Sequence, residues 1–142
     1  MKIYHTQKEI EADIKNNELF VDGDVKFECS FIINANLRIA GDIDARDINA
    51  WDINAENINA GDIIAWDIIA LNINANNILY YAFCCVYNSI KCKSIKSKRD
   101  KAHPPMCLDG KLEINEDKML EITLEQIAEK FGKDVKDIKI KK

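Results

Sequence analysis

The chain has 142 residues, of which 47% are hydrophobic and 31% are charged, and its formal net charge is −4 at pH 7. This length suits one domain with a continuous core, and the absence of an uncharged apolar run of about 18 residues argues against a transmembrane helix. The charged N-terminal segment lacks the apolar stretch of a secretory signal. Five cysteines without a CxxC pair are typical of a reducing compartment, so we expect a cytoplasmic protein.

Charge is distributed unevenly along the chain. Residues 1–80 contain 6 Lys/Arg and 14 Asp/Glu and carry −8, whereas residues 81–142 contain 14 and 10 and carry +4. Such asymmetry can mark a partner surface, and an incidental placement of the charges is the alternative.

The first predicted element is an N-terminal cap over residues 1–19. Thr6 followed by Glu9 matches the T-x-x-E pattern of a capping box, which predicts a helix over residues 7–15 with Ile10 and Ile14 facing inward. A solenoid needs such a cap because its first coil would otherwise expose the core and an unpaired strand edge.

Residues 20–97 are predicted to form a β-solenoid. From Gly41 to Ala75 one five-residue unit is repeated seven times without a break, and a degenerate eighth copy, NNILY, follows. Each unit carries Ile in one position and Ala two positions later, and this spacing places both side chains on one face of an extended segment. A fixed period of this kind predicts a mainly β fold with an interior of Ile and Ala.

The five-residue period, with two inward residues and an Asp or Asn in each unit, resembles the pentapeptide-repeat proteins. The resemblance covers roughly residues 30–97 and implies a right-handed, quadrilateral β-solenoid. The order of residues differs from the usual family pattern, because here the large residue precedes the small one, as I-x-A-x-D/N. Some members of that family mimic DNA with an acidic, rod-like solenoid that occupies the DNA site of a topoisomerase.

Two patterns within the repeat disagree on the length of a coil. Gly41 and Gly61 are twenty residues apart, which indicates four sides, whereas Trp51 and Trp66 are fifteen residues apart, which indicates three sides and places Tyr81 next in the column. The family resemblance favours twenty residues and four sides over a triangular coil.

After residue 80 the period slips by two residues and resumes at Ile90 and Ile95, so a final coil is expected to end near residue 97. Residues 98–105 have the composition of a loop and contain both prolines.

Residues 106–142 are predicted to form a small α/β cap. KLEI and KMLEI alternate like the arms of a hairpin, and a helix is expected to begin at Thr123, with Gln126 completing a capping box and Gly132 ending the helix. The tail at 134–142 is predicted to be a last short strand.

One predicted partner-binding patch consists of outward-facing apolar residues. In the I-x-A-x-x unit the residue between Ile and Ala points outward, and it is Ile at Ile64 and Ile69, with Trp66 between them at a corner. Together with Trp51 these residues predict a contact with a partner or a homodimer. The alternative is that the C-terminal module folds back and covers the patch.

The acidic residue before each repeat Ile is a second candidate. These positions are Asp42, Asp47, Asp52, Asp62 and Asp67. Asn replaces Asp in other copies, which favours a structural role as an acceptor of hydrogen bonds at each corner. The alternative is a phosphate-like array that binds a basic, nucleic-acid-handling protein.

Basic residues cluster in the segment that follows the repeat, and they form a candidate anion-binding site. They are Lys91, Lys93, Lys96, Lys98, Arg99 and Lys101. A phosphate backbone or an acidic partner would suit them, and a solvated loop is the simpler interpretation.

We expect no metal site, no cofactor and no enzymatic activity. The spacing of Cys84, Cys85, Cys92, His103 and Cys107 matches no common zinc pattern, and the chain has none of the common catalytic motifs.

The functional hypothesis is an acidic, DNA-mimic-like inhibitor of a topoisomerase or a host defence nuclease. The Ile-, Asn- and Lys-rich composition indicates a low-GC bacterium or its phage. The alternatives are a self-assembling scaffold and nucleic-acid binding through residues 91–101.

Overall fold

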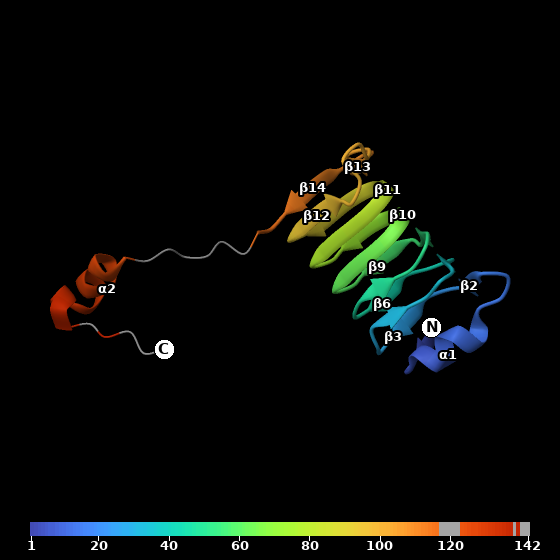
Figure 1. Ribbon diagram of the computed structural model, residues 1–142, viewed down its shortest axis with the longest axis horizontal. Helices are drawn as coiled ribbons and strands as arrows, with labels where there is room; N and C mark the ends of the chain where they lie inside the picture. Colours follow the sequence, from blue (N-terminus) through green and yellow to red (C-terminus); the bar gives the residue numbers. More distant parts are fainter. Residues whose placement is uncertain (117–122, 138, 140–142) are drawn as a thin grey trace.

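The computed structural model describes residues 1–116, 123–137 and 139. Up to Ile114 the chain forms a β-solenoid in which short strands stack in parallel from one coil to the next (Figure 1). The predicted mainly β solenoid is therefore confirmed. Within the described ranges, neither α-helix is long and apolar enough to cross a membrane.

Each coil has three sides, and stacking of the coils produces three faces. The first face contains β1 (Lys2–Tyr4), β3 (Val25–Phe27), β6 (Ile43–Ala45), β9 (Asn57–Asn59) and β14 (Lys111–Ile114). The second face contains β4 (Phe31–Ile32), β7 (Ile48–Asn49) and β12 (Ser94–Ser97). The third face contains β2 (Glu18–Val21), β5 (Asn36–Ile39), β8 (Ile53–Asn54) and β13 (Met106–Cys107). The long strands β10 (Asp62–Asn74) and β11 (Asn77–Cys92) run through all three sides and join the faces into one sheet.

The strand register shows that a coil of the regular repeat has fifteen residues. Ile63 of β10 pairs with Ile48, and on the next two sides the pairs are Ile68 with Ile53 and Ile73 with Ile58. Three five-residue sides therefore complete one turn, and the expectation of twenty residues and four sides is wrong.

The two glycines that suggested four sides lie at different corners. A Cβ on Gly61 would lie 2.6 Å from the carbonyl oxygen of Arg46, and a Cβ on Gly41 would lie 2.9 Å from the backbone nitrogen of Asp24. Each glycine is required because its corner approaches the backbone of the preceding coil too closely for a side chain. Their spacing therefore carries no information on coil length.

The interior of the solenoid is the predicted stack of Ile and Ala. All eight Ile residues of the repeat are at most 1% exposed, and the Ala residues are buried or half-buried. The earlier coils are longer, since β3 pairs with β6 at an offset of eighteen residues. Aromatic rings fill this wider interior: Phe27 lies 5.3 Å from Tyr4 and 4.4 Å from Phe31, measured between ring centroids.

The predicted slip of two residues is confirmed, and it occurs in two steps. The offset between β10 and β11 increases from fifteen to sixteen residues after the pair Ala65–Tyr80, and to seventeen after the pair Ala70–Val86. Single extra residues are thus accommodated at two successive corners, and the inward positions on the following side, Ile90 among them, remain buried.

The N-terminal end of the solenoid is covered by α1 (Gln7–Asp13). Thr6 accepts the backbone N–H of Glu9, as predicted, although the Glu9 carboxylate accepts the N–H of His5 rather than that of Thr6. Ile10 is fully buried and Ile14 is half-buried, so the predicted helical cap is confirmed. Because β1 already pairs with β3, parallel stacking starts at Lys2, before the predicted boundary at residue 20.

At the other end, parallel pairing continues past the predicted boundary at residue 97. Both β13 and β14 pair in parallel with β11, so KLEI is a strand of the solenoid. The KMLEI segment at 118–122 lies outside the described residues.

The predicted C-terminal helix is present as α2 (Leu124–Phe131). Thr123 and Gln126 form both hydrogen bonds of the capping box, and Gly132 ends the helix with a left-handed φ of 62°. The strand predicted over 134–142 is wrong at Val135–Asp137, which form the 3-10 helix η1. Residues 138 and 140–142 of that segment lie outside the described residues.

Candidate interaction edge

Aromatic side chains form a column at the corner between the second and third faces. The backbone N–H of Trp66 donates to the carbonyl of Trp51 at 2.7 Å, which places the two indoles on consecutive coils. The next residue in the column is Tyr81, whose ring centroid lies 5.9 Å from that of Trp66. Lys98 ends the column, with its ammonium 2.9 Å from the Tyr81 hydroxyl. We call Trp51, Trp66 and Tyr81 the aromatic edge.

The residues flanking this edge have the positions predicted for them. Ile64 is half-buried on the second face, Ile69 is 52% exposed on the third face, and Trp66 is 59% exposed at the corner between them. The described part of the C-terminal segment therefore does not cover Trp66 or Ile69. Whether this patch binds a partner or a second copy stays a prediction.

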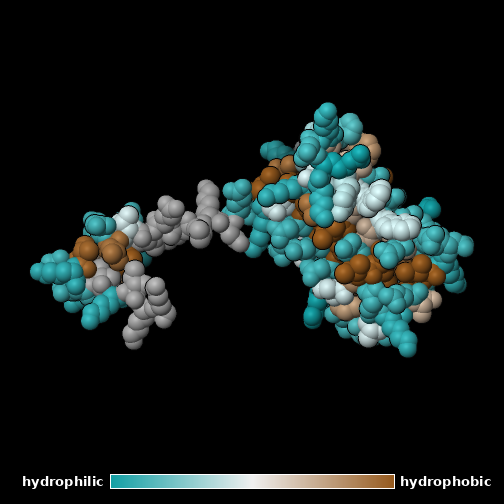
Figure 2. All heavy atoms as spheres, in the orientation of Figure 1, coloured by the Kyte–Doolittle hydropathy of each residue, from teal (hydrophilic) through white to brown (hydrophobic). Residues whose placement is uncertain are grey.

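The third face carries further exposed apolar residues that the sequence analysis missed. They surround Ile69 and line one shallow depression, and we call this group the apolar face: Phe20, Ile69, Leu71, Tyr87 and Leu108. The sequence carried little signal for this group, because Phe20, Tyr87 and Leu108 lie outside the regular repeat and reach Ile69 only through the offsets of the irregular coils. Exposed hydrophobic residues, coloured brown in Figure 2, occur among hydrophilic ones on the solenoid.

The acidic residues before each Ile do not form a single column. A three-sided coil distributes them over three corners, with Asp42 at one, Asp47 and Asp62 at the next, and Asp52 and Asp67 at the third. The five carboxylates therefore do not reproduce one continuous row of phosphates.

Most of these carboxylates accept hydrogen bonds from a neighbouring coil. Asp47 accepts the backbone N–H of Asp62 at 2.9 Å and the hydroxyl of Ser30 at 2.8 Å. These two hydrogen bonds lower the pKa of the Asp47 carboxyl below its ordinary value, with the backbone donor as the larger cause. Asp67 accepts the backbone N–H of Phe83 at 3.0 Å in the same way. The structural interpretation of these residues is thus supported by their geometry.

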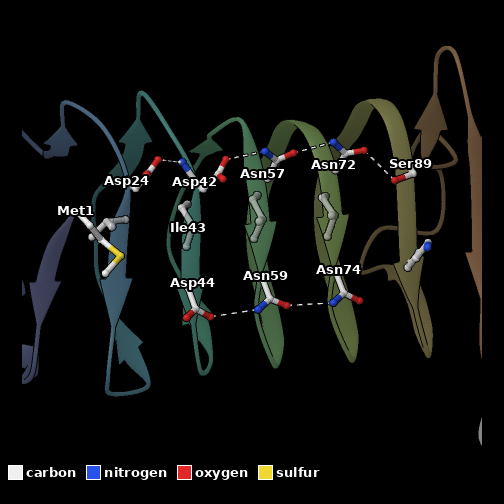
Figure 3. A pocket seen from close by; sticks show the side chains of 14 residues that line it. Met1, Asp24, Asp42, Ile43, Asp44, Asn57, Asn59, Asn72, Asn74 and Ser89 are labelled. Carbon is white, nitrogen blue, oxygen red and sulfur yellow. Dashed lines mark hydrogen bonds between the residues drawn. The ribbon is translucent and has the colours of Figure 1, made fainter.

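The first face is occupied by two ladders of hydrogen-bonded polar side chains (Figure 3). In one ladder the amide of Asn57 donates to Asp42 at 2.6 Å, and Asn72 donates to Asn57 at 2.7 Å. In the parallel ladder Asn59 donates to Asp44 at 3.2 Å, and Asn74 donates to Asn59 at 3.1 Å. Asn57, Asn59 and Asn72 each donate to the coil before and accept from the coil after, where Ser89 donates to Asn72 at 2.8 Å. Side chains on this face therefore largely satisfy one another.

The basic segment is wound around the solenoid instead of forming one patch. Lys91 lies on the first face beside Glu113, with 4.0 Å between charged atoms, and Lys96 lies on the second face opposite Leu79. Lys98 lies at the aromatic edge. The geometry therefore gives little support to a single anion-binding site formed by these residues.

The cysteines contribute to the interior of the last coils. Cys84 and Cys92 are buried, and burial raises the pKa of the Cys84 thiol to about 12, which makes it a poor nucleophile. In the part of the chain that the structure describes, no group of three or more His, Cys, Asp or Glu side chains is arranged to hold a metal ion.

No protein-family model, curated protein or solved structure matches this chain.

Proposed function

We propose that this protein is a non-enzymatic binding protein that engages a basic, nucleic-acid-handling protein through its aromatic edge. The observation that carries the proposal is the exposure of Trp51 (41%) and Trp66 (59%) on adjacent coils. Tryptophan is the residue most enriched at the energetic centres of protein interfaces. A large exposed indole on a rigid β-coil also loses little conformational entropy on binding.

The surroundings of the edge favour a basic partner. Asp52 and Asp67 each follow a Trp of the edge in the sequence, and Asp52 is exposed. Residues 1–80 carry −8 overall. Arg and Lys side chains of a partner would therefore meet carboxylates for ion pairing and indole faces for cation–π contacts. Net negative charge would also accelerate association with a positively charged protein.

This proposal modifies the phosphate-mimic hypothesis. The carboxylates are divided over three corners, and several of them already accept hydrogen bonds. This arrangement suits a partner that binds an aromatic edge flanked by acidic groups. The resemblance to the pentapeptide-repeat proteins makes a topoisomerase the first target to test, and a defence nuclease is the second.

The test has a binding measurement and an activity measurement. Tagged protein is used to capture partners from a low-GC bacterial lysate at increasing salt, with and without duplex DNA as competitor, and to inhibit supercoiling by a purified bacterial topoisomerase. We expect capture of a basic nucleic-acid-binding protein that weakens as salt rises and that duplex DNA displaces. The double variant Asp52→Asn/Asp67→Asn should lose part of this affinity.

Direct binding of duplex DNA by the purified protein, or capture of the same proteins by the wild type and by an unrelated acidic protein, would contradict the proposal. Capture that salt does not weaken would also contradict it, because the attraction would then not be electrostatic.

A further inference from the structure

The C-terminal end of the solenoid exposes residues that occupy core positions. Leu112 of β14 pairs with the buried Ile90, and Ile114 pairs with the buried Cys92, so both occupy inward positions of the coil. Yet Leu112 is 37% exposed and Ile114 is 48% exposed. Among the described residues, β12, β13 and β14 each pair only with β11, which leaves their outer backbone edges without a partner strand.

The N-terminal end shows how this fold closes such a surface. There α1 lies over the first coil, and its Ile10 is fully buried in the core. A helix of seven residues is about 10 Å long, and this short element is sufficient to cover one end of the interior. The C-terminal end lacks an equivalent cover in the described arrangement.

The helix α2 has an apolar stripe that is exposed to solvent. Leu124 is 38% exposed and Phe131 is 69% exposed, with Ile127 between them on the same side of the helix. Figure 2 shows this exposed hydrophobic surface on α2. An eight-residue helix is marginal in water without tertiary contacts, although both of its ends carry good caps. Packing of this stripe against another apolar surface would therefore stabilise α2.

From these observations we infer that α2 closes the C-terminal end of the solenoid of its own chain, with Leu124, Ile127 and Phe131 covering Leu112 and Ile114. Leu124 follows Ile114 by ten residues, and an extended chain of that length reaches about 33 Å. A helix of eight residues is about 12 Å long, similar to a five-residue side of about 16 Å.

The small cross-section of the solenoid favours α2 as the cover of this end over a second copy of the chain stacked end to end. A triangle with sides of about 16 Å has an area of roughly 110 Å², far below the roughly 800 Å² per partner of a stable protein interface. A tethered helix needs no such area, because a short linker provides an effective concentration in the millimolar range. Docking of α2 also covers the free strand edges that would otherwise favour association between chains.

Hydrogen exchange of residues 111–114 tests this inference in the full chain. The double variant Leu124→Ser/Phe131→Ser should accelerate exchange at these amides by about tenfold or more, because the end of the solenoid opens more easily. The matched control Glu125→Ser/Lys130→Ser changes the polar side of α2 without altering net charge, and it should leave exchange unchanged. The reciprocal variant Leu112→Ser/Ile114→Ser should accelerate amide exchange within α2 itself.

The concentration of protein separates docking within the chain from docking between chains. If α2 docks on its own solenoid, the protection of residues 111–114 from hydrogen exchange stays the same on serial dilution. The wild type then does not associate through this end. Equal exchange in the wild type and in Leu124→Ser/Phe131→Ser would overturn the inference, as would protection that disappears on dilution. Neither readout depends on the partner of the aromatic edge, so this inference and the proposed function fail independently.

Discussion

The first face and the aromatic edge are built on the same three-sided backbone and the same Ile and Ala interior, but they present different residues to solvent. On the first face, side chains hydrogen-bond one another from coil to coil in two ladders, as Asn72 does with Asn57 and Asn74 with Asn59. At the aromatic edge, Trp51 and Trp66 also lie on consecutive coils, but a large part of each indole is exposed. Inward residues therefore specify the fold of this solenoid, and outward residues divide between stabilising neighbouring coils and offering surface to a partner.

The largest effect should come from the residues that both regions share. Replacing Ile53 or Ile68 by Asp places an unpaired charge at a position that is at most 1% exposed, at a cost of several kcal/mol. We expect loss of cooperative thermal unfolding by circular dichroism for either variant. A melting temperature equal to that of the wild type would show that these positions do not face the core.

The ladders of the first face should respond to a small change in chemistry. In Asn57→Asp the amide that donates to Asp42 becomes a second carboxylate, and we expect a loss of about 1–3 kcal/mol of stability at neutral pH. Part of the loss should be recovered below about pH 4, when a carboxyl becomes protonated. Chemical denaturation at both pH values measures this effect.

The control for that variant is Asn54→Asp on the third face, where the side chain is exposed. We expect a change within about 0.5 kcal/mol, as for most surface substitutions. Equal effects of Asn54→Asp and Asn57→Asp would show that the ladder contributes nothing beyond its exposed polar groups.

Outward apolar residues should matter little for folding. The triple variant Ile64→Ser/Trp66→Ser/Ile69→Ser removes two exposed side chains and the half-buried Ile64, so we expect its free energy of unfolding to fall by no more than about 1–2 kcal/mol. Light scattering of the same variant and of the wild type reports whether this patch forms a homodimer. Complete unfolding of the variant would place these side chains in the core.

The smallest expected effect is the pH dependence from Asp47. Its pKa is lower in the folded chain than its ordinary value of about 3.9, so the ionised carboxylate stabilises the fold at pH values above 3.9. This contribution is lost as the pH falls through the folded pKa. In Asp47→Asn the decrease in stability between pH 5 and acid should be smaller than in the wild type, as measured by urea unfolding across this pH range. An identical decrease would exclude the carboxylate as a contributor.

The interior could be predicted from the sequence because the two-residue spacing of Ile and Ala admits only one assignment in an extended chain. The number of sides could not, since it depends on how tightly the backbone turns at corners such as Gly61, where the preceding coil approaches closely. The patch at Ile64, Trp66 and Ile69 was accessible because it lies within one stretch of sequence. The apolar face was not, because Phe20 and Leu108 are brought together only by the coil offsets of the irregular ends.

Two double variants, compared in one capture experiment, test whether the aromatic edge is the binding surface. Trp51→Ala/Trp66→Ala removes both indoles of the aromatic edge, and Asn59→Ala/Asn74→Ala alters the first face by the same number of substitutions. Circular dichroism confirms that both remain folded, and the partner captured from lysate is quantified for each by mass spectrometry. We predict that the first-face variant retains the partner of the wild type. The edge variant should bind that partner about a hundredfold more weakly and fail to capture it. Retention of the partner by the edge variant, or its loss by the first-face variant alone, would contradict the assignment of binding to the aromatic edge.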